Sequence, residues 1–384
     1  MNDRDRLTLA ALATAALPER EFVGVSGQAI SSGDVTRVDI VDSTGKKWTV
    51  ARPDSEAAGA EIIGQPSVLQ LLLNFSKEGK ISFQVPTPAG WAPLLEGGRA
   101  AVYPALEGAS ADVEAMTPAL ATSFAEGMCQ LHTLPTTAFS AQGVPTFTAE
   151  ECRNRLLADL DEAAPARVIP KRLWQRWEEM LENVSWWRFN PRFVHGAISA
   201  DSVLFKAGRL SALHDFSSCH IGDPARDLSW LMAIASPEAI EAALQAYSPA
   251  KPDPHLAERA ELDSELALVR WLLHGMHRKD LQIIEDARQM LRDLADLVLD
   301  NPNPRESVSA AFQSASPVLG TPVGDSTAVN TSAQPSSDES SSTPSNGEPE
   351  QKRAGEADSE AVTTVIPFEQ LVAEGHAEPE SDEN

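Results

Sequence analysis

The residues of this chain that could do chemistry are concentrated between positions 193 and 230. Two short apolar segments, 203–205 and 210–214, flank a Gly-containing turn and predict a β-hairpin. Ser202 and Asp215 then fall at its open end, opposite one another or nearly so, where facing residues have Cα atoms about 4.5–5.5 Å apart. Two oxygen-bearing side chains so placed could share a hard cation such as Mg²⁺, which prefers oxygen ligands. The alternative is a hairpin whose ends are merely polar.

The order of the motifs around this hairpin resembles that of a known family. The chain reads HGAISADSVLF, then HDF, then GDPARDLSW, and this pattern resembles the aminoglycoside phosphotransferase family, including its macrolide-kinase relatives. A hairpin ending at 48–53, a helix containing 68–69, a hinge-like segment at 102–108 and a helix end at 131–135 agree in order and spacing. The resemblance covers about residues 8–300. It implies an α+β, protein-kinase-like fold with a small β-rich lobe and a larger helical lobe.

The catalytic loop departs from the family pattern at its two main positions. The family reads His-Gly-Asp-Leu-His-x-x-Asn, in which the Asp orients and deprotonates the acceptor hydroxyl and the Asn holds a metal ion. In loop 195–202 of this chain, Ala197 stands at the Asp position and Ser202 at the Asn position. A methyl group cannot accept a proton. Asp201 could substitute as the base if the loop is remodelled; otherwise it is an exposed loop aspartate.

The resemblance assigns the binding of ATP and Mg²⁺ to four positions. Asp215 matches the metal-binding Asp, and Ser202 could add a neutral oxygen ligand to the same cation. Arg52 falls where the family places a phosphate-contacting Lys or Arg, and Gln65 stands where a Glu would pair with it. Gln65 can hydrogen-bond the guanidinium but supplies no charge; Glu61, about one turn earlier, is the alternative partner.

Three further residues match positions that brace the catalytic loop in the family. They are His195, at the start of the loop, and the two aspartates of the GDPARDL segment, Asp223 and Asp227. A possible phosphate-covering turn lies at Gly24–Gly27. Nothing in the sequence matches a Walker A loop.

The pattern of the chain predicts the elements that must hold these residues. Residues 1–104 form the expected β-rich lobe, with a hairpin centred on the turn at 43–45. Residues 105–300 form the expected helical lobe. Helix starts are predicted at Thr117-Pro118, at the capping box of Thr148 and Glu151, and at Ser236-Pro237, and two long amphipathic helices near 258–277 and 279–300 complete the lobe.

Composition excludes several classes of protein. With 31 Lys and Arg against 56 Asp and Glu, the 384-residue chain has a net charge of −25, which repels nucleic-acid backbones and anionic membrane surfaces. Three cysteines without a CxxC pair support neither a disulfide framework nor a zinc cluster. The apolar run at 7–17 lacks a basic preceding segment, so we interpret it as the first helix of the fold rather than an export signal. We expect a cytoplasmic protein with no membrane span.

The last part of the chain, residues 301–384, has a different composition. Between 311 and 384 there are 14 acidic and two basic residues among many Ser, Thr, Pro and Gly. Such a segment cannot bury enough apolar surface to offset its ordering entropy, so we expect disorder. An apolar island at 361–375 interrupts it. It is either a chance patch or a segment that binds a partner or the chain's own folded part.

Two functional hypotheses follow. In the first, the protein is a catalytically impaired member of the phosphotransferase family, a pseudokinase that acts by binding a small molecule or, through its tail, a protein. In the second, it is an active ATP- and Mg²⁺-dependent kinase that uses Asp201 or substrate-assisted proton loss on a hydroxyl of a cationic or sugar-like acceptor. An acidic cleft would suit a cationic acceptor.

Overall fold

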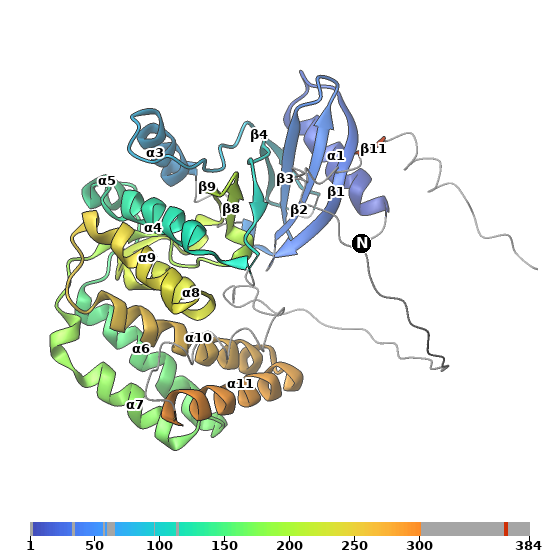
Figure 1. Cartoon of the computed structure of the whole chain (residues 1–384). Coiled ribbons are helices and arrows are strands. Elements are labelled where there is room, and N and C mark those ends of the chain that lie inside the picture. Colours follow the sequence, from blue (N-terminus) through green and yellow to red (C-terminus); the bar gives the residue numbers. More distant parts are fainter. Residues whose placement is uncertain are drawn as a thin grey trace, which may run out of the picture.

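The computed structural model contains a small sheet-based lobe and a larger helical lobe (Figure 1). It describes residues 3–32, 35–56, 58–59, 66–95, 97–112, 115–300 and 365–367. The expected two-lobe α+β architecture is therefore confirmed.

The small lobe is built on a six-stranded antiparallel sheet in the order β11-β1-β2-β3-β5-β4. The strands are β1 (Phe22–Ser32), β2 (Val35–Asp42), β3 (Lys47–Pro53), β4 (Gly90–Pro93), β5 (Arg99–Pro104) and β11 (Val365–Pro367). The predicted hairpin is β2–β3. Its turn is closed by the buried carboxylate of Asp42, which accepts hydrogen bonds of 3.0 Å from the backbone N–H groups of Thr44 and Lys46. Gly45, with φ of 82°, supplies the left-handed residue that this turn requires.

The two faces of this sheet have different partners because side chains alternate along each strand. Helix α1 (Asp3–Ala16) covers one face, where its Leu9 and Ala13 pack with Val38, Val50 and their neighbours in an apolar core. The opposite face carries a smaller apolar group, Ala51, Ala101 and Tyr103, and is turned towards the helical lobe. The face that a strand residue occupies therefore decides whether it can reach the cleft between the lobes.

Three helices of the large lobe begin at the caps that the sequence predicts. They are α4 (Pro118–His132), α5 (Thr136–Ser140), α6 (Ala149–Ala163), α7 (Lys171–Glu182), α8 (Ala225–Ile234), α9 (Pro237–Tyr247), α10 (Leu256–Arg278) and α11 (Leu281–Asp300), with α3 (Pro66–Lys77) packed beside them. Thr117 and Ser236 accept hydrogen bonds from backbone N–H groups of the first turns of α4 and α9, and Thr148 forms both bonds of its capping box with Glu151. These three predicted caps are confirmed.

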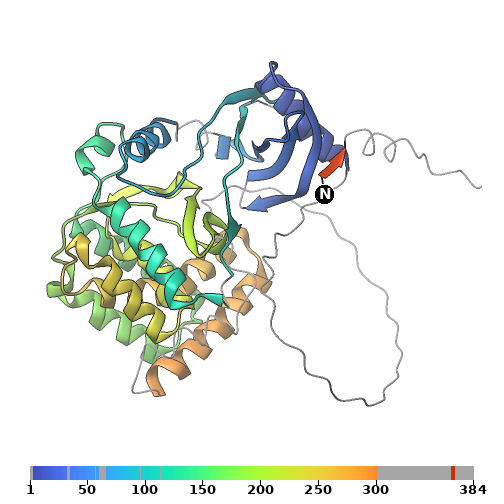
Figure 2. The ribbon, with the colours of Figure 1, turned by 45° about the horizontal axis from the view of Figure 1, so that its top comes forward.

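A short hairpin, β8 (Val203–Lys206) and β9 (Arg209–Leu213), lies between the small lobe and the helices (Figure 2). Strand β6 (Ala109–Ser110) extends it, and β7 (Arg192–Val194) pairs with β10 (His220–Gly222) nearby. The pairing of Val203 with Leu213 brings Ser202 opposite His214, so Asp215 is one residue further along. The predicted hairpin is thus confirmed, with Ser202 and Asp215 nearly opposite in the backbone.

Most of the tail, residues 301–364 and 368–384, lies outside the described residues, and with it the expectation of disorder and most of the island at 361–375. Val365–Pro367 form β11, which pairs antiparallel with Gly24–Ser26 of β1. Among the residues that the structure describes, none of the helices is both long enough and apolar enough to cross a bilayer.

Candidate functional site

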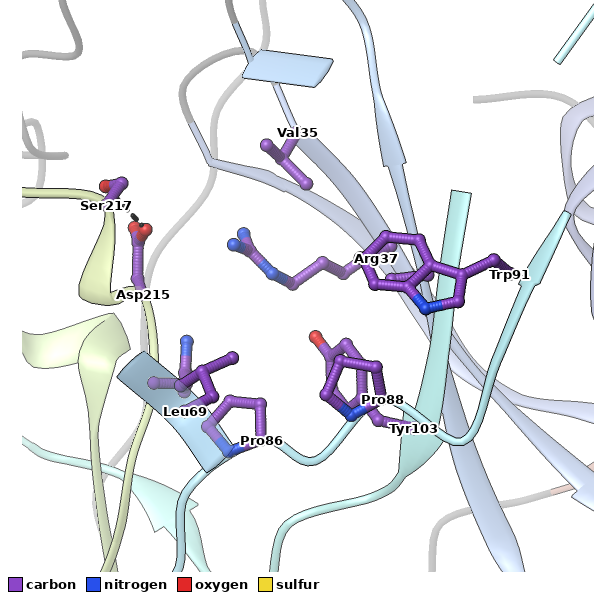
Figure 3. A pocket seen from close by; sticks show the side chains of 12 residues that line it. Val35, Arg37, Leu69, Pro86, Pro88, Trp91, Tyr103, Asp215 and Ser217 are labelled. Atoms are coloured by element: carbon purple, nitrogen blue, oxygen red, sulfur yellow. Dashed lines mark hydrogen bonds between the residues drawn. The ribbon is translucent and has the colours of Figure 1, made fainter. Parts of the chain in front are cut away.

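The cleft between the sheet and the β8–β9 hairpin contains a small cavity of about 50 Å³. Arg37 extends into it from β2, and Asp215 faces it from the end of β9 (Figure 3). The remaining walls are mainly apolar: Val35, Ala51, Leu69, Pro86, Pro88, Trp91, Ala101 and Tyr103, with His214 and Ser217 on the hairpin side. A cation and a carboxylate thus meet across a largely apolar cleft.

The cation of this cleft is Arg37, and the expectation for Arg52 is wrong. Arg37 pairs with Ala51 in the β2–β3 register, so both lie on the cleft face, whereas Arg52 pairs with Thr36 on the opposite face. The guanidinium of Arg52 binds Asp54 at 2.9 Å instead and does not line the cavity. Arg37 forms no ion pair with any described carboxylate. Along residues 35–42 (VTRVDIVD), Arg37 alternates with the apolar residues that face the core. This alternation was the signal that could have identified Arg37 as the cation of the cleft.

Arg37 also sets the charge state of its neighbours. Burial raises the pKa of Tyr103, while the charge of Arg37 and a hydrogen bond with it act in the opposite direction. Burial and the charge of Arg37 together lower the pKa of His214 to about 4. Tyr103 and His214 are consequently neutral at pH 7, and Arg37 and Asp215 carry the charges of the cleft.

Asp215 is held in an uncommon backbone conformation. Its φ of 69° lies in the left-handed region, which few non-glycine residues adopt, and its Oδ1 accepts a hydrogen bond of 2.9 Å from the hydroxyl of Ser217. Such local strain persists where the surrounding structure fixes it, and here it turns the carboxylate into the cleft. Asp215 therefore presents its carboxylate to the cleft, and its role as a metal ligand stays a prediction.

Ser202 does not join Asp215 as a cation ligand. Its side chain is buried, its hydroxyl donates to the carbonyl of Ser199 at 3.0 Å, and it accepts the backbone N–H of Ser199 at 2.9 Å. These bonds close a short turn, Ala200–Ser202, and keep the hydroxyl away from the cavity. The predicted shared site is wrong for this reason.

The donor set of the cleft fits Mg²⁺ only in company with phosphate. Of the described residues that line the cavity, Asp215 alone carries a carboxylate, and no group of three or more His, Cys, Asp or Glu side chains in the described part of the chain could hold a metal ion. Mg²⁺ commonly uses one or two protein carboxylates together with substrate phosphates and water. Asp215 matches that mode and would not hold the ion alone.

The loop that carries Ala197 is fixed by a buried carboxylate. Asp227 accepts hydrogen bonds of 2.7 Å from the backbone N–H groups of both His195 and Gly196, and its Oδ2 lies 3.0 Å from Nε2 of His132. His195 reaches across to the carbonyl of His214 at 2.9 Å. Asp227 and His195 therefore tie the loop to the segment that presents Asp215.

Asp223 has a different partner from the one expected of a loop brace. Its carboxylate binds the guanidinium of Arg259 at 2.7 and 3.1 Å, and its Oδ1 accepts the N–H of Ala225. It thereby joins the start of α8 to α10. Loop 195–202 is instead contacted by Arg226, whose Nε donates a hydrogen bond to the carbonyl of Gly196 at 3.0 Å.

Neither Ala197, at the family position of the catalytic base, nor Asp201, its possible substitute, is placed to act as a base. Ala197 lies in the braced loop, with its N–H 3.4 Å from Nδ1 of His195, and presents only a methyl group. Asp201 is exposed in the turn before β8 and lines neither this cavity nor the one described next. Gln65 and Glu61 lie outside the described residues, and Gly24–Gly27 belong to strand β1 rather than to a turn.

A second and larger cavity, of about 440 Å³, lies within the helical lobe beside loop 195–202. Gly196 and Asp223 line it, and Ser217 lines both cavities. Helices α6, α8 and α10 contribute an unusual number of arginines: Arg155, Arg226, Arg259 and Arg270. Sequence reasoning missed this group because its members are spread over more than one hundred residues of the chain.

Comparisons with known proteins identify the family of the chain. A family model described as the phosphotransferase enzyme family matches residues 27–262. The uncharacterized protein YcbJ of Bacillus subtilis (strain 168) is 20% identical over 201 residues, which are 48% of this chain and 62% of that protein. The match therefore spans less than two thirds of the length of this curated relative.

Solved structures of phosphotransferases share the fold. The macrolide 2'-phosphotransferase MphH from Brachybacterium faecium is 22% identical, with a TM-score of 0.58 over 68% of this chain and 90% of that one. The GDP complex of aminoglycoside 2'-phosphotransferase-IIIa is 19% identical, with a TM-score of 0.63 over 74% and 97%. At such low identity the likeness shows the fold, which is the expected kinase-like one.

Replacing Asp227, which holds loop 195–202 in place, should lower the free energy of unfolding by an amount that depends on pH. Burial alone would raise the pKa of Asp227, but the hydrogen bond and charge of His132, the charge of His195 and the N–H of Gly196 outweigh it and lower that pKa below its ordinary 3.8. The stabilisation is therefore present above about pH 4 and is lost as the pH falls further. Asp227→Ala should lower the free energy of unfolding at pH 7 by about 3–5 kcal/mol and flatten its acid dependence.

Urea unfolding at pH 7 and pH 3.5 measures both effects. Asp161→Ala, at an exposed position on α6, is the matched control and should behave like the natural chain. Equal stability of the two variants at pH 7 would contradict the role given to Asp227.

Proposed function

The chain belongs to the phosphotransferase enzyme family, and we propose that it binds a nucleoside triphosphate with Mg²⁺ between Arg37 and Asp215, is impaired in phosphoryl transfer, and acts by binding. The observation that carries this proposal is that Arg37 and Asp215 face the same cavity from the sheet and from the end of β9. Loop 195–202, which His195 joins to the carbonyl of His214, carries Ala197 at the position that the resemblance assigns to the base, although Ala197 itself lines neither cavity.

Charge neutralisation is the task of the two retained residues. Phosphoryl transfer depends mainly on positioning and on the neutralisation of phosphate charge, and a guanidinium is well suited to bind phosphate oxygens. Arg37 would bind the phosphates from the sheet side. Asp215 would hold a Mg²⁺ ion, which would neutralise part of the phosphate charge. Leu69, Trp91 and Tyr103 provide apolar surface beside this charged pair.

The missing base accounts for the impairment. General acid–base groups typically contribute about 10²–10⁴-fold to rate, and the braced loop holds Ala197 in place through Asp227. Asp201, the candidate substitute, points to solvent rather than into either cavity. The alternative of an active kinase that uses Asp201 would require this turn to be rebuilt.

Nucleotide binding would widen the cleft. The enclosed space of about 50 Å³ is smaller than the roughly 300–1,000 Å³ of ordinary ligand pockets. The large cavity of the helical lobe is in that range and adjoins the cleft at Ser217, so we assign it to the second ligand, on the acceptor side of the site.

Nucleotide affinity should separate the two candidate arginines. We expect Arg37→Gln to weaken binding of ATP with Mg²⁺ about tenfold or more, because it removes a charged hydrogen-bond donor from the cleft. Asp215→Asn should abolish the dependence of affinity on Mg²⁺. Arg52→Gln, which removes the same charge from the opposite face of the sheet, is the matched control and should bind within twofold of the natural chain. Isothermal titration calorimetry measures all three.

Two outcomes would contradict the proposal. One is a loss of affinity in Arg52→Gln that Arg37→Gln does not show. The other is an absence of binding by the natural chain at millimolar ATP and Mg²⁺.

A further inference from the structure

The large cavity of the helical lobe is walled by charged residues from three helices. On α6, Cys152, Arg155, Leu156 and Asp159 follow one another at helical spacing and all line it. Helix α8 contributes Arg226, and α10 contributes Asp263 and Arg270. The chemistry of a ligand in this space depends on how these charges are balanced.

Two of the arginines share a single carboxylate. Nη1 of Arg226 lies 3.2 and 3.0 Å from the two oxygens of Asp263, and Nη1 of Arg270 lies 3.0 Å from Oδ1 of the same group. Burial would raise the pKa of Asp263, but the charges of Arg226 and Arg270 outweigh it, so its carboxylate is ionised. One of the two positive charges is left without a counterion in this group.

Arg155 and Asp159 complete the wall. Arg155 is exposed at the cavity's edge, where its guanidinium stacks 4.4 Å from the centre of the Phe147 ring, and it forms no ion pair with a described carboxylate. Burial raises the pKa of Asp159, which favours the uncharged acid, while the charges of Arg270, Arg226 and Arg155 oppose this shift. Asp159 thus compensates the arginines incompletely.

The two thiols and the imidazole that line the cavity add no negative charge at pH 7. Burial raises the pKa of the Cys152 thiol to about 11 and that of Cys219 to about 12, and it lowers the pKa of His220. Arg259 is enclosed between Asp223 and Asp253, of which only Asp223 lines the cavity. The four lining arginines therefore face three lining aspartates in a chain whose net charge is −25.

We propose that this cavity binds a hydroxylated oxyanion, which Arg155 holds together with Arg226 and Arg270. The anionic group is either the carboxylate of a sugar acid or the phosphate of a sugar phosphate. Guanidinium groups bind such oxyanions through two parallel hydrogen bonds. The proposal rests on the proposed function in one respect, namely that the cavity adjoins the nucleotide cleft as the second-ligand site. It replaces the expectation of a cationic acceptor, which followed from the charge of the whole chain and not from the charge of this wall.

Sugars of equal size and different charge test this proposal. We expect D-glucuronate or D-glucose 6-phosphate to raise the melting temperature of the full chain, in a titratable manner, more than D-glucose does, and D-glucosamine to have no effect. The two acids distinguish carboxylate from phosphate recognition. Arg155→Gln should weaken the binding of the effective acid about tenfold, and Asp159→Asn should strengthen it. Arg209→Gln, on the exposed turn of the β8–β9 hairpin, removes the same charge outside the cavity and should have no effect.

The outcomes also separate this proposal from the function on which it rests. A larger shift with D-glucosamine, equal shifts with all four compounds, or no shift with either acid at tens of millimolar would overturn it. Loss of nucleotide binding in Arg37→Gln is measured at the other cavity and leaves this result unaffected.

A second inference comes from the edge of the sheet. Strand β11 pairs residue by residue with β1, Val365 with Ser26, Ile366 with Val25 and Pro367 with Gly24, and so occupies the edge that β1 would otherwise present. An unpaired edge strand offers free N–H and C=O groups to any extended segment. Here the occupant is a segment of the same chain, 64 residues beyond the end of α11.

The position of β11 along β1 connects it with the cleft. The β1–β2 ladder is regular up to the pair of Ser26 with Asp39, is interrupted by an irregularity, and resumes at the pair of Ile30 with Arg37. β11 ends where this irregularity begins, and Arg37 lies directly beyond it. The docked strand therefore pairs with the half of β1 that is bonded to residues 39–41 of β2, next to the half that pairs with Arg37.

We infer that Val365–Pro367 dock on the β1 edge of their own chain and steady the β1–β2 hairpin. Hydrogen exchange measures this in the full chain. Ile366→Pro removes a backbone donor from β11 and should speed exchange of those amides among Gly24–Ser26 that face β11 by tenfold or more, with Val50 in β3 unchanged. Val372→Pro, outside β11, is the matched control.

A synthetic peptide of residues 361–375, added to Ile366→Pro, should restore the protection. Unchanged exchange in Ile366→Pro, or an equal increase in Val372→Pro, would show that the edge is not held by this strand.

Discussion

The hydrogen bonds of the buried Asp227 carboxylate are the interactions on which the rest of the site depends. This carboxylate satisfies the N–H groups of His195 and Gly196 and is itself held by His132, whose other ring nitrogen lies 2.7 Å from the hydroxyl of Tyr247. Because unpaired N–H groups are costly inside a protein, this loop has one favoured conformation. Gly196 of this loop lines the larger cavity, and His195 contacts the carbonyl of His214, which lines the smaller one.

The alternation of side chains along β2 and β3 decides which charged side chain of the sheet faces the cleft between the lobes. A shift of one residue along a strand moves a side chain to the other face of the sheet. On β3, Ala51 lies on the cleft face and the next residue, Arg52, lies on the opposite face. Arg37, which pairs with Ala51 from the neighbouring strand β2, supplies the positive charge of the cleft face instead. A positive charge is therefore kept in the cleft although the strand expected to supply it carries alanine there.

Local patterns predicted local structure well. The turn at Gly45, the caps at Thr117, Thr148 and Ser236 and the β8–β9 hairpin depend on neighbouring residues, and the order of motifs was sufficient for the fold. Side-chain direction was harder, as Arg52 shows.

Ser202 failed as a ligand because its hydroxyl found closer partners in Ser199, a competition typical of serine next to a turn. The arginine wall could not be predicted because it exists only when α6, α8 and α10 pack around one space. The sign of its charge is opposite to that of the chain as a whole. The net charge of the whole chain therefore does not describe the charge of this wall.

The central claim is that the cleft keeps its cation and its carboxylate and lacks only a base. Phosphate release from ATP with Mg²⁺, compared between the natural chain and Ala197→Asp, tests it most directly. The account predicts background release by the natural chain, an increase of about 10²-fold or more in the variant, and loss of that gain when Asp215→Asn is added. Rapid release by the natural chain, or no gain in an Ala197→Asp protein that binds ATP normally, would contradict it.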